Sequence, residues 1–330
     1  MNRIQIGIST YNDYKYLALL LQSIRWYTYL DDEAFDLVVC DDGTQDEKVR
    51  EKTAKVAARY GAGFIRHELN QGIPATWNHL AEALGGTSEI IVLLNNDLLV
   101  PPNWLKVAVH FLDANKDNPQ VGSCFWNPIN RVPYGAMKAI LPLLGHTLFS
   151  TADQLTNDDL GYLTQHGVSN VSSKQGEGQG LGRVMAPCGC CFAFRREVWK
   201  QAGPFDERLT SFHEEIDWGT RCASLGKASF GFAYPRPYHT HGYTFGANVE
   251  LEASKRMQES RALYREKWGV PTTAGLNEYL QYVHEKLMPL IPPTRLKYLA
   301  PDYDAEPEER ELPGGEIMRT PRLVEREGEF

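Results

Sequence analysis

Acidic side chains occur at several points of the sequence where a carboxylate could take part in chemistry. Asp97 follows the apolar run from Glu89 to Leu94. A hard divalent cation could bridge this carboxylate and a diphosphate group, because such cations prefer oxygen ligands. Asp97 could equally cap the turn before Pro101 and Pro102, so this residue alone leaves both interpretations open.

Three further carboxylates lie close together in the segment Phe212-His213-Glu214-Glu215-Ile216-Asp217-Trp218. Acidic residues at the start of a helix are favoured by the helix dipole alone. One of them could also act as a general base that removes the proton of an attacking hydroxyl group. In a helix Glu214 and Asp217 share a face and Glu215 points elsewhere, so the segment offers at least two roles.

Two other pairs could bind a ligand. His239 and His241 could donate imidazole nitrogens to a metal or to phosphate oxygens. In an extended chain their rings point to opposite sides, so at most one of them is expected to be a ligand. Asp41 and Asp42 could accept hydrogen bonds from a nucleobase imide or a ribose hydroxyl, although Asp-Gly is also a plain turn signal.

Strands and helices alternate through the first 125 residues and would position these groups. We expect strands at 4–9, 36–40, 63–67 and 89–94, each followed by a helix or a turn. Near-continuous apolar strands that alternate with helices indicate a doubly wound, mostly parallel sheet. Such sheets bind ligands at the carboxyl ends of their strands, where segments 10–13, 41–44 and 95–97 all fall.

The rest of the chain is less regular. Residues 127–187 are expected to make a long excursion on the acceptor side of the active face, because they contain early prolines and a glycine-rich end. We predict a catalytic domain over 1–250, a helical extension over 251–290, and an acidic tail over 291–330 that is flexible or docked on a second subunit of a homo-oligomer. The glycines at 176–182 match no dinucleotide fingerprint.

Composition narrows the class of protein further. The net charge is −8, and residues 301–330 hold ten acidic against four basic side chains, so the remaining body is nearly neutral. A neutral body lacks the basic footprint of a nucleic-acid-binding protein. Cys188, Cys190 and Cys191 have no second cluster to complete a zinc site. Without a signal peptide or a transmembrane run, we expect a cytoplasmic protein.

In order along the chain, these pieces resemble the family 2 glycosyltransferases. The matching segments are Ile8–Asn12, Cys40–Thr44, Asn70–Gly72 with Asn78, Leu93–Asp97, Arg195–Glu197 with Gly203–Glu207, Glu214–Asp217, and Lys267–Gly269. No single segment is specific, whereas seven in order across residues 4–269 are highly specific. The resemblance implies a GT-A fold, Rossmann-like, and transfer with inversion at the anomeric carbon. It also implies a divalent cation, Mn²⁺ or Mg²⁺.

The same resemblance assigns roles by position. The donor nucleotide-sugar would be held by Thr10, Tyr11, Asn12, Asp41, Asp42, Asn70, Gly72, Asn78, Asn95 and Asn96. Asp97 would bind the metal, with His241, or less favourably His239, completing that site. Glu215 stands where the family usually has the aspartate that serves as base, and Glu214 and Asp217 remain alternatives.

Two departures from the family pattern bear on these roles. Asn95-Asn96-Asp97 has one carboxylate where the family motif has two, and Glu215 is one methylene longer than the usual aspartate. The donor is expected to be a UDP-, GDP- or dTDP-sugar. The acceptor stays open among glycan, lipid-linked saccharide, protein and modified nucleobase. The rival interpretations are a non-catalytic nucleotide-sugar-binding protein and, less favoured, a sugar nucleotidyltransferase.

Overall fold

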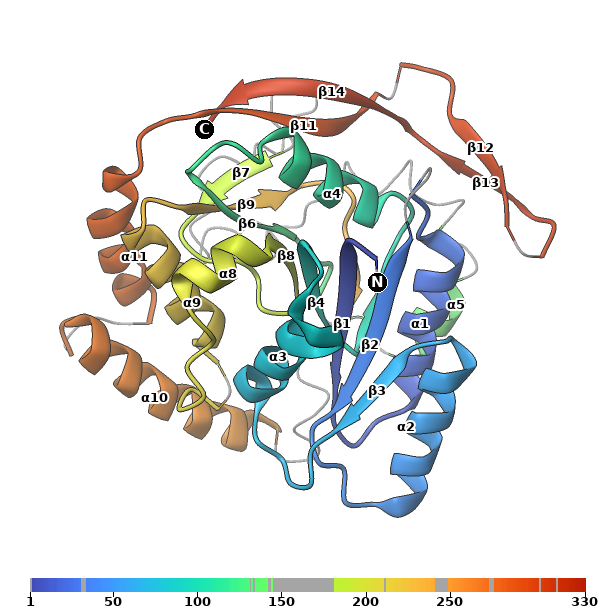
Figure 1. Cartoon of the computed structure of the whole chain (residues 1–330), viewed down its shortest axis with the longest axis horizontal. Helices are drawn as coiled ribbons and strands as arrows, with labels where there is room; N and C mark the ends of the chain where they lie inside the picture. The colour runs from blue at the N-terminus through green and yellow to red at the C-terminus, as the bar shows by residue number, and fades with distance from the viewer. Residues whose placement is uncertain are drawn as a thin grey trace.

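A computed structural model describes residues 2–30, 34–130, 132, 134–141, 144, 181–210, 212–240, 249–272, 276–302, 304–312 and 314–330. Within these residues the centre is an eight-stranded sheet of order β3-β2-β1-β4-β8-β6-β9-β7, with helices on both faces (Figure 1). Its strands are β1 (Ile4–Thr10), β2 (Phe35–Asp41), β3 (Gly63–Arg66), β4 (Ile90–Asn95), β6 (Val121–Trp126), β7 (Leu181–Val184), β8 (Cys191–Arg195) and β9 (Ala228–Phe232).

The strands β3, β2, β1 and β4 run parallel, as the sequence predicts. The strand β8 is antiparallel to both β4 and β6, β9 is parallel to β6, and β7 is antiparallel to β9. All seven residues of β1 are buried, because helices cover it on both faces. This mixed α/β sheet confirms the predicted fold class.

The helices are α1 (Lys15–Tyr27), α2 (Glu47–Arg59), α3 (Ile73–Glu82), α4 (Trp104–Ala114), α5 (Tyr134–Ile140), α8 (Arg196–Ala202), α9 (Glu214–Ser224), α10 (Val249–Trp268) and α11 (Leu276–Leu287), with two short 3₁₀ turns at Ala83–Gly86 and Met288–Leu290. In the view of Figure 1, α3, α8 and α9 lie in front of the sheet. A small second sheet pairs β5 (Leu98–Leu99) with β10 (Tyr238–His239), which follow β4 and β9 along the chain.

The C-terminal extension differs from the prediction. Helices α10 and α11 form as expected, but the segment predicted as a flexible tail over 291–330 makes β-strands instead: β11 (Arg295–Asp302), β12 (Glu308–Glu311), β13 (Ile317–Thr320) and β14 (Arg322–Glu329). They pair antiparallel as β11–β14 and β12–β13, and the resulting ribbon runs along one side of the molecule past α4 (Figure 1). The physical reason is period-2 alternation, which an acidic composition hides: Leu296 and Tyr298 are buried, and Arg295 and Lys297 are exposed.

No helix in the described ranges is long and apolar enough to cross a bilayer. Of the predicted excursion 127–187, the structure describes 127–130, 132, 134–141, 144 and 181–187. Its proposed role in shaping the acceptor site concerns residues that lie largely outside the described ranges.

Candidate active site

The carboxyl ends of β1, β2 and β4 bring three polar segments to one edge of the sheet. In the strand register Thr10 pairs with Asp41, and Ser9 pairs with both Cys40 and Asn95. Parallel strands end on the same side, so segments 10–13, 41–44 and 95–97 lie together. The structure therefore confirms the predicted meeting of these segments.

Asp41 is fully buried at the end of β2. Its Oδ1 accepts hydrogen bonds from the Thr44 backbone N–H at 3.2 Å and from the Thr44 hydroxyl. Its Oδ2 is buried and has no hydrogen-bond partner among the described residues. A buried acceptor without a partner costs free energy, so this oxygen is suited to a donor group of a ligand.

Asp42 differs from its neighbour, because protein donors occupy both of its oxygens. The backbone N–H groups of Gln71 and Gly72 donate to it at 2.8 and 2.9 Å, the Asn70 amide donates at 2.9 Å, and His67 Nδ1 lies 2.8 Å away. These bonds fasten the loop between β3 and α3. Asp42, Asn70 and Gly72 thus form one structural unit at the edge of the site.

The loop after β1 is held by its own bonds. The Thr10 hydroxyl donates to the Asp13 carbonyl at 3.1 Å, and the Asn12 N–H donates to Thr44 Oγ1 at 2.9 Å. Tyr11 is partly buried and Asn12 is exposed. The first of these bonds is to Asp13, which belongs to the polar segment 10–13 but received no role of its own from the sequence.

Asp13 accepts from the N–H groups of Lys15 and Tyr16, at 3.0 Å each, and from the Asn96 amide at 2.9 Å. It joins the start of α1 to the segment after β4. Its signal in the sequence was a short acidic residue just before a helical pattern, which is the pattern of a helix cap.

The asparagines divide between the site and the scaffold. Asn95 Oδ1 lies 3.4 Å from the Ser9 hydroxyl, at the carboxyl ends of β1 and β4. Asn78 instead ties α3 to the turn before α9: its amide donates to the Phe205 carbonyl at 3.0 Å and to Glu207 at 2.9 Å, and it accepts from the Phe205 N–H at 2.8 Å.

Asp97 and His239 face each other at the end of β4. The distance from Asp97 Oδ1 to His239 Nε2 is 3.2 Å, and both side chains are buried. Pairing of β10 with β5 brings them together, since His239 lies opposite Leu98. His239 Nδ1 lies 2.8 Å from Asn130 Oδ1, which orients the ring. His241 lies outside the described residues.

The environment of His239 acts on its pKa in two directions. Burial lowers the pKa of the imidazole, but the adjacent charge of Asp97 and the hydrogen bond to it outweigh burial and raise it. A carboxylate and an imidazole nitrogen fit a Mn²⁺ or Mg²⁺ ion that takes its other ligands from a substrate diphosphate and from water. In the described part of the chain no third His, Cys, Asp or Glu joins them.

The three carboxylates at the start of α9 occupy different environments. Asp217 is completely buried and accepts from Lys267 Nζ at 2.8 Å, Arg221 Nε at 3.1 Å and Trp268 Nε1 at 2.9 Å. Its oxygens are therefore taken up by a network that joins α9 to α10. The matching segment Lys267–Gly269 of the sequence is one partner of this network.

Glu214 and Glu215 lack such partners. Glu214 is 6% exposed, and burial together with the charge of Glu215 raises its pKa well above the usual value. Burial raises the pKa of Glu215 to about 7. One carboxylate oxygen of each is buried without a hydrogen-bond partner in the described structure. Of the three, Glu215 has the pKa of a base that works near neutrality.

The loop 186–190 connects this pair to the strand ends. The Asn95 N–H donates to the Cys190 carbonyl at 2.9 Å, and Gly189 of the same loop lies against the side chain of Glu215. Cys188, Cys190 and Cys191 are buried, with Sγ–Sγ distances of 3.5 and 3.4 Å between successive sulfurs. Hydrogen bonds among the thiols and burial raise the pKa of Cys190 well above its usual value, which favours neutral thiols over metal-bound thiolates.

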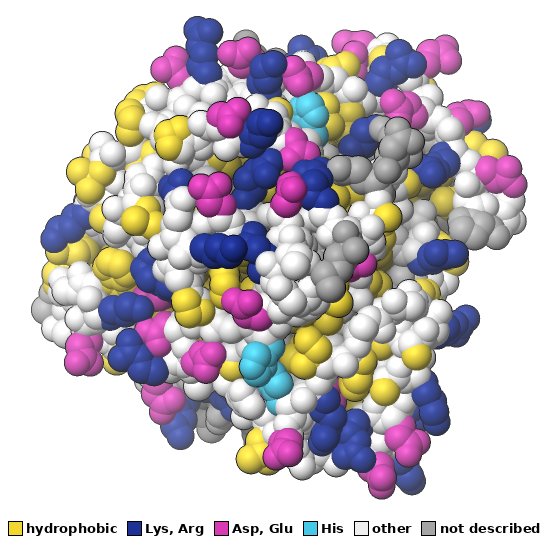
Figure 2. All heavy atoms as spheres, in the orientation of Figure 1, with side chains coloured by type: hydrophobic (Ala, Val, Ile, Leu, Met, Phe, Trp, Pro, Cys, Tyr) yellow, Lys and Arg dark blue, Asp and Glu magenta, His cyan; other side chains and the backbone are white. Residues whose placement is uncertain are grey.

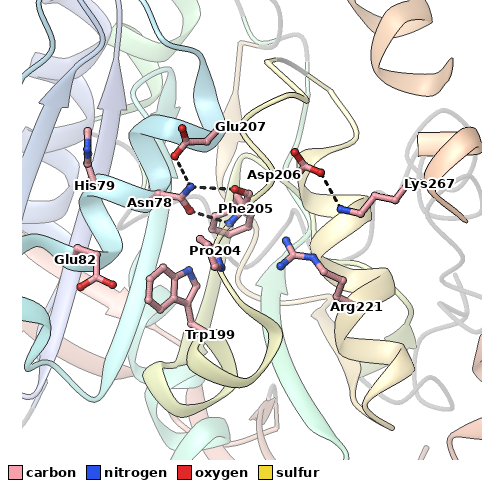
Figure 3. Close-up of a pocket in the computed structure, with 10 residues that line it drawn as sticks. All are labelled: Asn78, His79, Glu82, Trp199, Pro204, Phe205, Asp206, Glu207, Arg221 and Lys267. Atoms are coloured by element: carbon pink, nitrogen blue, oxygen red, sulfur yellow. Dashed lines mark hydrogen bonds and ion pairs between the residues drawn. The ribbon is translucent and has the colours of Figure 1, made fainter. Parts of the chain in front are cut away.

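A cavity of about 530 Å³ lies between α3, α8, α9 and the turn 203–207 (Figure 3). Asn78 is the only predicted site residue among those that line it in the described structure. Two charged side chains that line this cavity bind each other, since Lys267 donates to Asp206 at 2.9 Å. The hydrogen bond from Arg208, together with that from Lys267, holds the pKa of Asp206 well below its usual range. The other predicted site residues that the structure describes do not line this cavity. On the face drawn in Figure 2, Lys and Arg are interspersed with Asp and Glu.

The large, mostly parallel α/β sheet with flanking helices is a GT-A, Rossmann-like fold. The family model for glycosyl transferase family 2 matches residues 5–203, and the chain belongs to this family. Membership of this family makes a glycosyltransferase the class of protein to which the chain belongs.

A solved structure shares the fold, and others are more distantly similar. A structure of GalNAc-T7 with UDP, GalNAc and Mn²⁺ aligns with a TM-score of 0.54 at 13% identity, covering 98% of this chain and 68% of that one. A Staphylococcus aureus TarS structure of residues 1–349 aligns with a TM-score of 0.46 at 15% identity, covering 88% and 83%. The chain spans 42% of the longer TarS chain it matches. No curated protein sequence matches it.

Proposed function

We propose that this enzyme transfers a sugar from a nucleoside-diphosphate-sugar to an acceptor hydroxyl with inversion at the anomeric carbon. The observation that carries the proposal is the contact of Asp97 with His239 at the carboxyl end of β4. It provides a carboxylate and an imidazole where a divalent cation and a diphosphate would bind together. Asp41 lies at the end of β2, on the same edge.

Each group has a role in this reaction. Asp41 Oδ2 would accept a hydrogen bond from the base or ribose of the donor, because it is a buried acceptor without a partner among the described residues. Asp97 and His239 would hold Mn²⁺ or Mg²⁺, with His241 as a further candidate. When bound, such a cation neutralises the charge that develops on the leaving diphosphate.

Glu215 would serve as the general base. Its carboxylate removes the proton of the acceptor hydroxyl while that oxygen forms a bond to the anomeric carbon. The bond from this carbon to the diphosphate oxygen breaks, and the diphosphate leaves with the electron pair. We prefer Glu215 to Asp217, whose oxygens are bound by Lys267, Arg221 and Trp268. We also prefer it to Glu214, whose pKa is raised well above the usual value by burial and by the charge of Glu215.

Donor binding tests the metal site. We expect Mn²⁺ to raise the melting temperature in the presence of UDP, and Asp97→Ala to abolish this increase while the fold remains intact, because a ligand stabilises only the state that binds it. Thermal shift with UDP, GDP and dTDP, each with and without Mn²⁺, measures the effect and identifies the nucleobase that the donor carries. Asp46→Ala, at the exposed start of α2, is the matched control. An unchanged Mn²⁺-dependent shift in Asp97→Ala would contradict the assignment.

A further inference from the structure

We propose that Gly189 positions the carboxylate of Glu215, and that the absence of a side chain at 189 makes room for a glutamate where a shorter aspartate would otherwise fit. The inference rests on the proposed role of Glu215 as base. It explains how the active site tolerates the additional methylene group that distinguishes this chain from the usual family pattern.

The contact between the two residues is close. A Cβ atom at position 189 would lie 3.1 Å from Cδ, 3.3 Å from Cγ and 3.3 Å from Oε1 of Glu215. Carbon atoms at their optimal separation are about 3.5–4.0 Å apart. All three nearest atoms belong to Glu215, so the added methyl group of an alanine would press on the carboxylate itself.

Backbone conformation does not account for glycine at this position. Gly189 is not among the glycines with positive φ, in contrast to Gly203 at the end of α8. An alanine could therefore adopt the backbone of residue 189 without strain. The available space toward Glu215 is the remaining reason for a glycine.

The helix α9 and the loop 185–190 are packed closely on either side of this contact. One turn after Glu215 on α9, a Cβ atom at Gly219 would lie 2.5 Å from Ala186 Cα and 2.8 Å from the Met185 carbonyl, so the helix lies directly on the backbone of the loop. The Asn95 N–H holds the other end of the loop through the Cys190 carbonyl at 2.9 Å. The three nearest atoms belong to the side chain of Glu215, which has rotatable bonds, so this side chain is expected to yield before the backbone does.

Displacement of this carboxylate would impair catalysis. A general base must approach the proton it removes to about 2.6–3.2 Å between heavy atoms. A misplacement of about 1 Å can cost about 10²-fold in rate, so the shift of a few tenths of an ångström that an added Cβ requires should cost less than that. Gly189 would thus affect turnover through the position of Glu215, without contact with the donor.

A reciprocal pair of substitutions tests the idea. We expect Gly189→Ala to lower the turnover number for Mn²⁺-dependent hydrolysis of UDP-glucose, UDP-N-acetylglucosamine or UDP-N-acetylgalactosamine by about 3- to 10-fold with little change in KM. Glu215→Asp should also lower it. The turnover number of the double variant Gly189→Ala with Glu215→Asp should be higher than the two single effects multiplied together would give, because the shorter side chain leaves room for the methyl group.

The control is Gly314→Ala, at a glycine with no atom within 4 Å of an added Cβ and no positive φ. It should leave the turnover number and KM unchanged. If the loss of turnover in the double variant equals the product of the losses in the two single variants, the role of Gly189 is overturned. Normal hydrolysis by Glu215→Gln would instead overturn the proposed base, so the two failures can be distinguished.

Two measurements do not depend on the choice of donor. A crystal structure of Gly189→Ala should show the Glu215 carboxylate displaced, and the melting temperature of Gly189→Ala should be lowered and partly restored in the double variant. An unmoved carboxylate, or no coupling between the two melting temperatures, would contradict the proposal even if none of the three donors is hydrolysed.

Discussion

At the scale of single residues, the number of protein partners separates side chains that hold the fold from side chains that could meet a substrate. Asp42 and Asp217 have donors on both oxygens. Asp41, Glu214 and Glu215 each keep a buried oxygen that no described residue satisfies. Since buried polar groups are normally satisfied, these oxygens are the sites at which a ligand would contribute most.

We expect Glu215→Gln to reduce transfer or donor hydrolysis by about 10²- to 10⁴-fold, because the amide keeps the shape but cannot take a proton. Donor affinity, measured by thermal shift with UDP and Mn²⁺, should change little. In the wild type, turnover should rise with pH through about 7, since burial raises the pKa of Glu215 to that value and only the ionised form is a base. A flat profile between pH 6 and 8 would contradict this assignment.

The same pKa predicts an effect on stability with a defined sign. The unfolded carboxyl loses its proton near 4.5 and the folded one near 7, so the wild type loses stability as the pH rises between these values. Glu215→Gln lacks this loss. It should match the wild type below pH 4.5 and be more stable at pH 8 by an amount of the order of 1–3 kcal/mol. Denaturant unfolding at the two pH values measures the difference.

At the scale of elements, the start of α9 is where helix, loop and extension meet. Its N-terminus is preceded by two residues with positive φ, Phe212 and His213, and its buried face touches the loop 185–189. Asp217 fastens the same helix to the end of α10 through Lys267 and Trp268. Of the three carboxylates, Asp217 therefore fixes the helix and Glu215 lies beside the loop, while Glu214 is buried at the start of the helix.

Asp217→Asn tests this division. Removing one partner of a buried ion pair leaves uncompensated charge and typically costs about 3–5 kcal/mol, so we expect a loss of stability of that order in denaturant unfolding. Turnover per folded molecule should fall less than in Glu215→Gln. Glu207→Gln, which alters an exposed residue of the neighbouring turn, serves as control. A variant of normal stability with abolished turnover would instead identify Asp217 as the base.

At the scale of the whole molecule, the C-terminal ribbon is part of the folded body. Asn115 at the end of α4 bonds the backbone of Lys297 in both directions, at 2.7 and 3.0 Å. The ring of Tyr298 lies 5.8 Å from that of Phe330, which in turn lies 6.4 Å from Phe230 in the central sheet. The pair of strands β11 and β14 thereby extends the hydrophobic core beyond residues 5–203, which the family model matches.

Leu296→Ala measures how firmly the ribbon is attached. Leu296 is completely buried in the main hydrophobic core, so its truncation should cost about 2–5 kcal/mol of unfolding free energy. Lys297→Ala, at the adjacent exposed position, should cost less than about 1 kcal/mol. Equal and small effects of both would show that the ribbon is detached in solution, as the acidic composition suggested.

The sequence by itself determined the parallel strands, the helices between them and the edge at which Thr10, Asp41 and Asp97 meet, because apolar periodicity and turn residues are local signals. Seven short segments in order were enough to indicate the family. Only the tertiary structure decided which acidic residues have partners. Asp42 is satisfied by a loop about 30 residues away and Asp217 by a helix about 50 residues away, and such distances leave no periodic trace along the chain. The ribbon was hidden for a related reason: its charged residues dominate the composition, while its few buried side chains become evident only when β11 lies on α4.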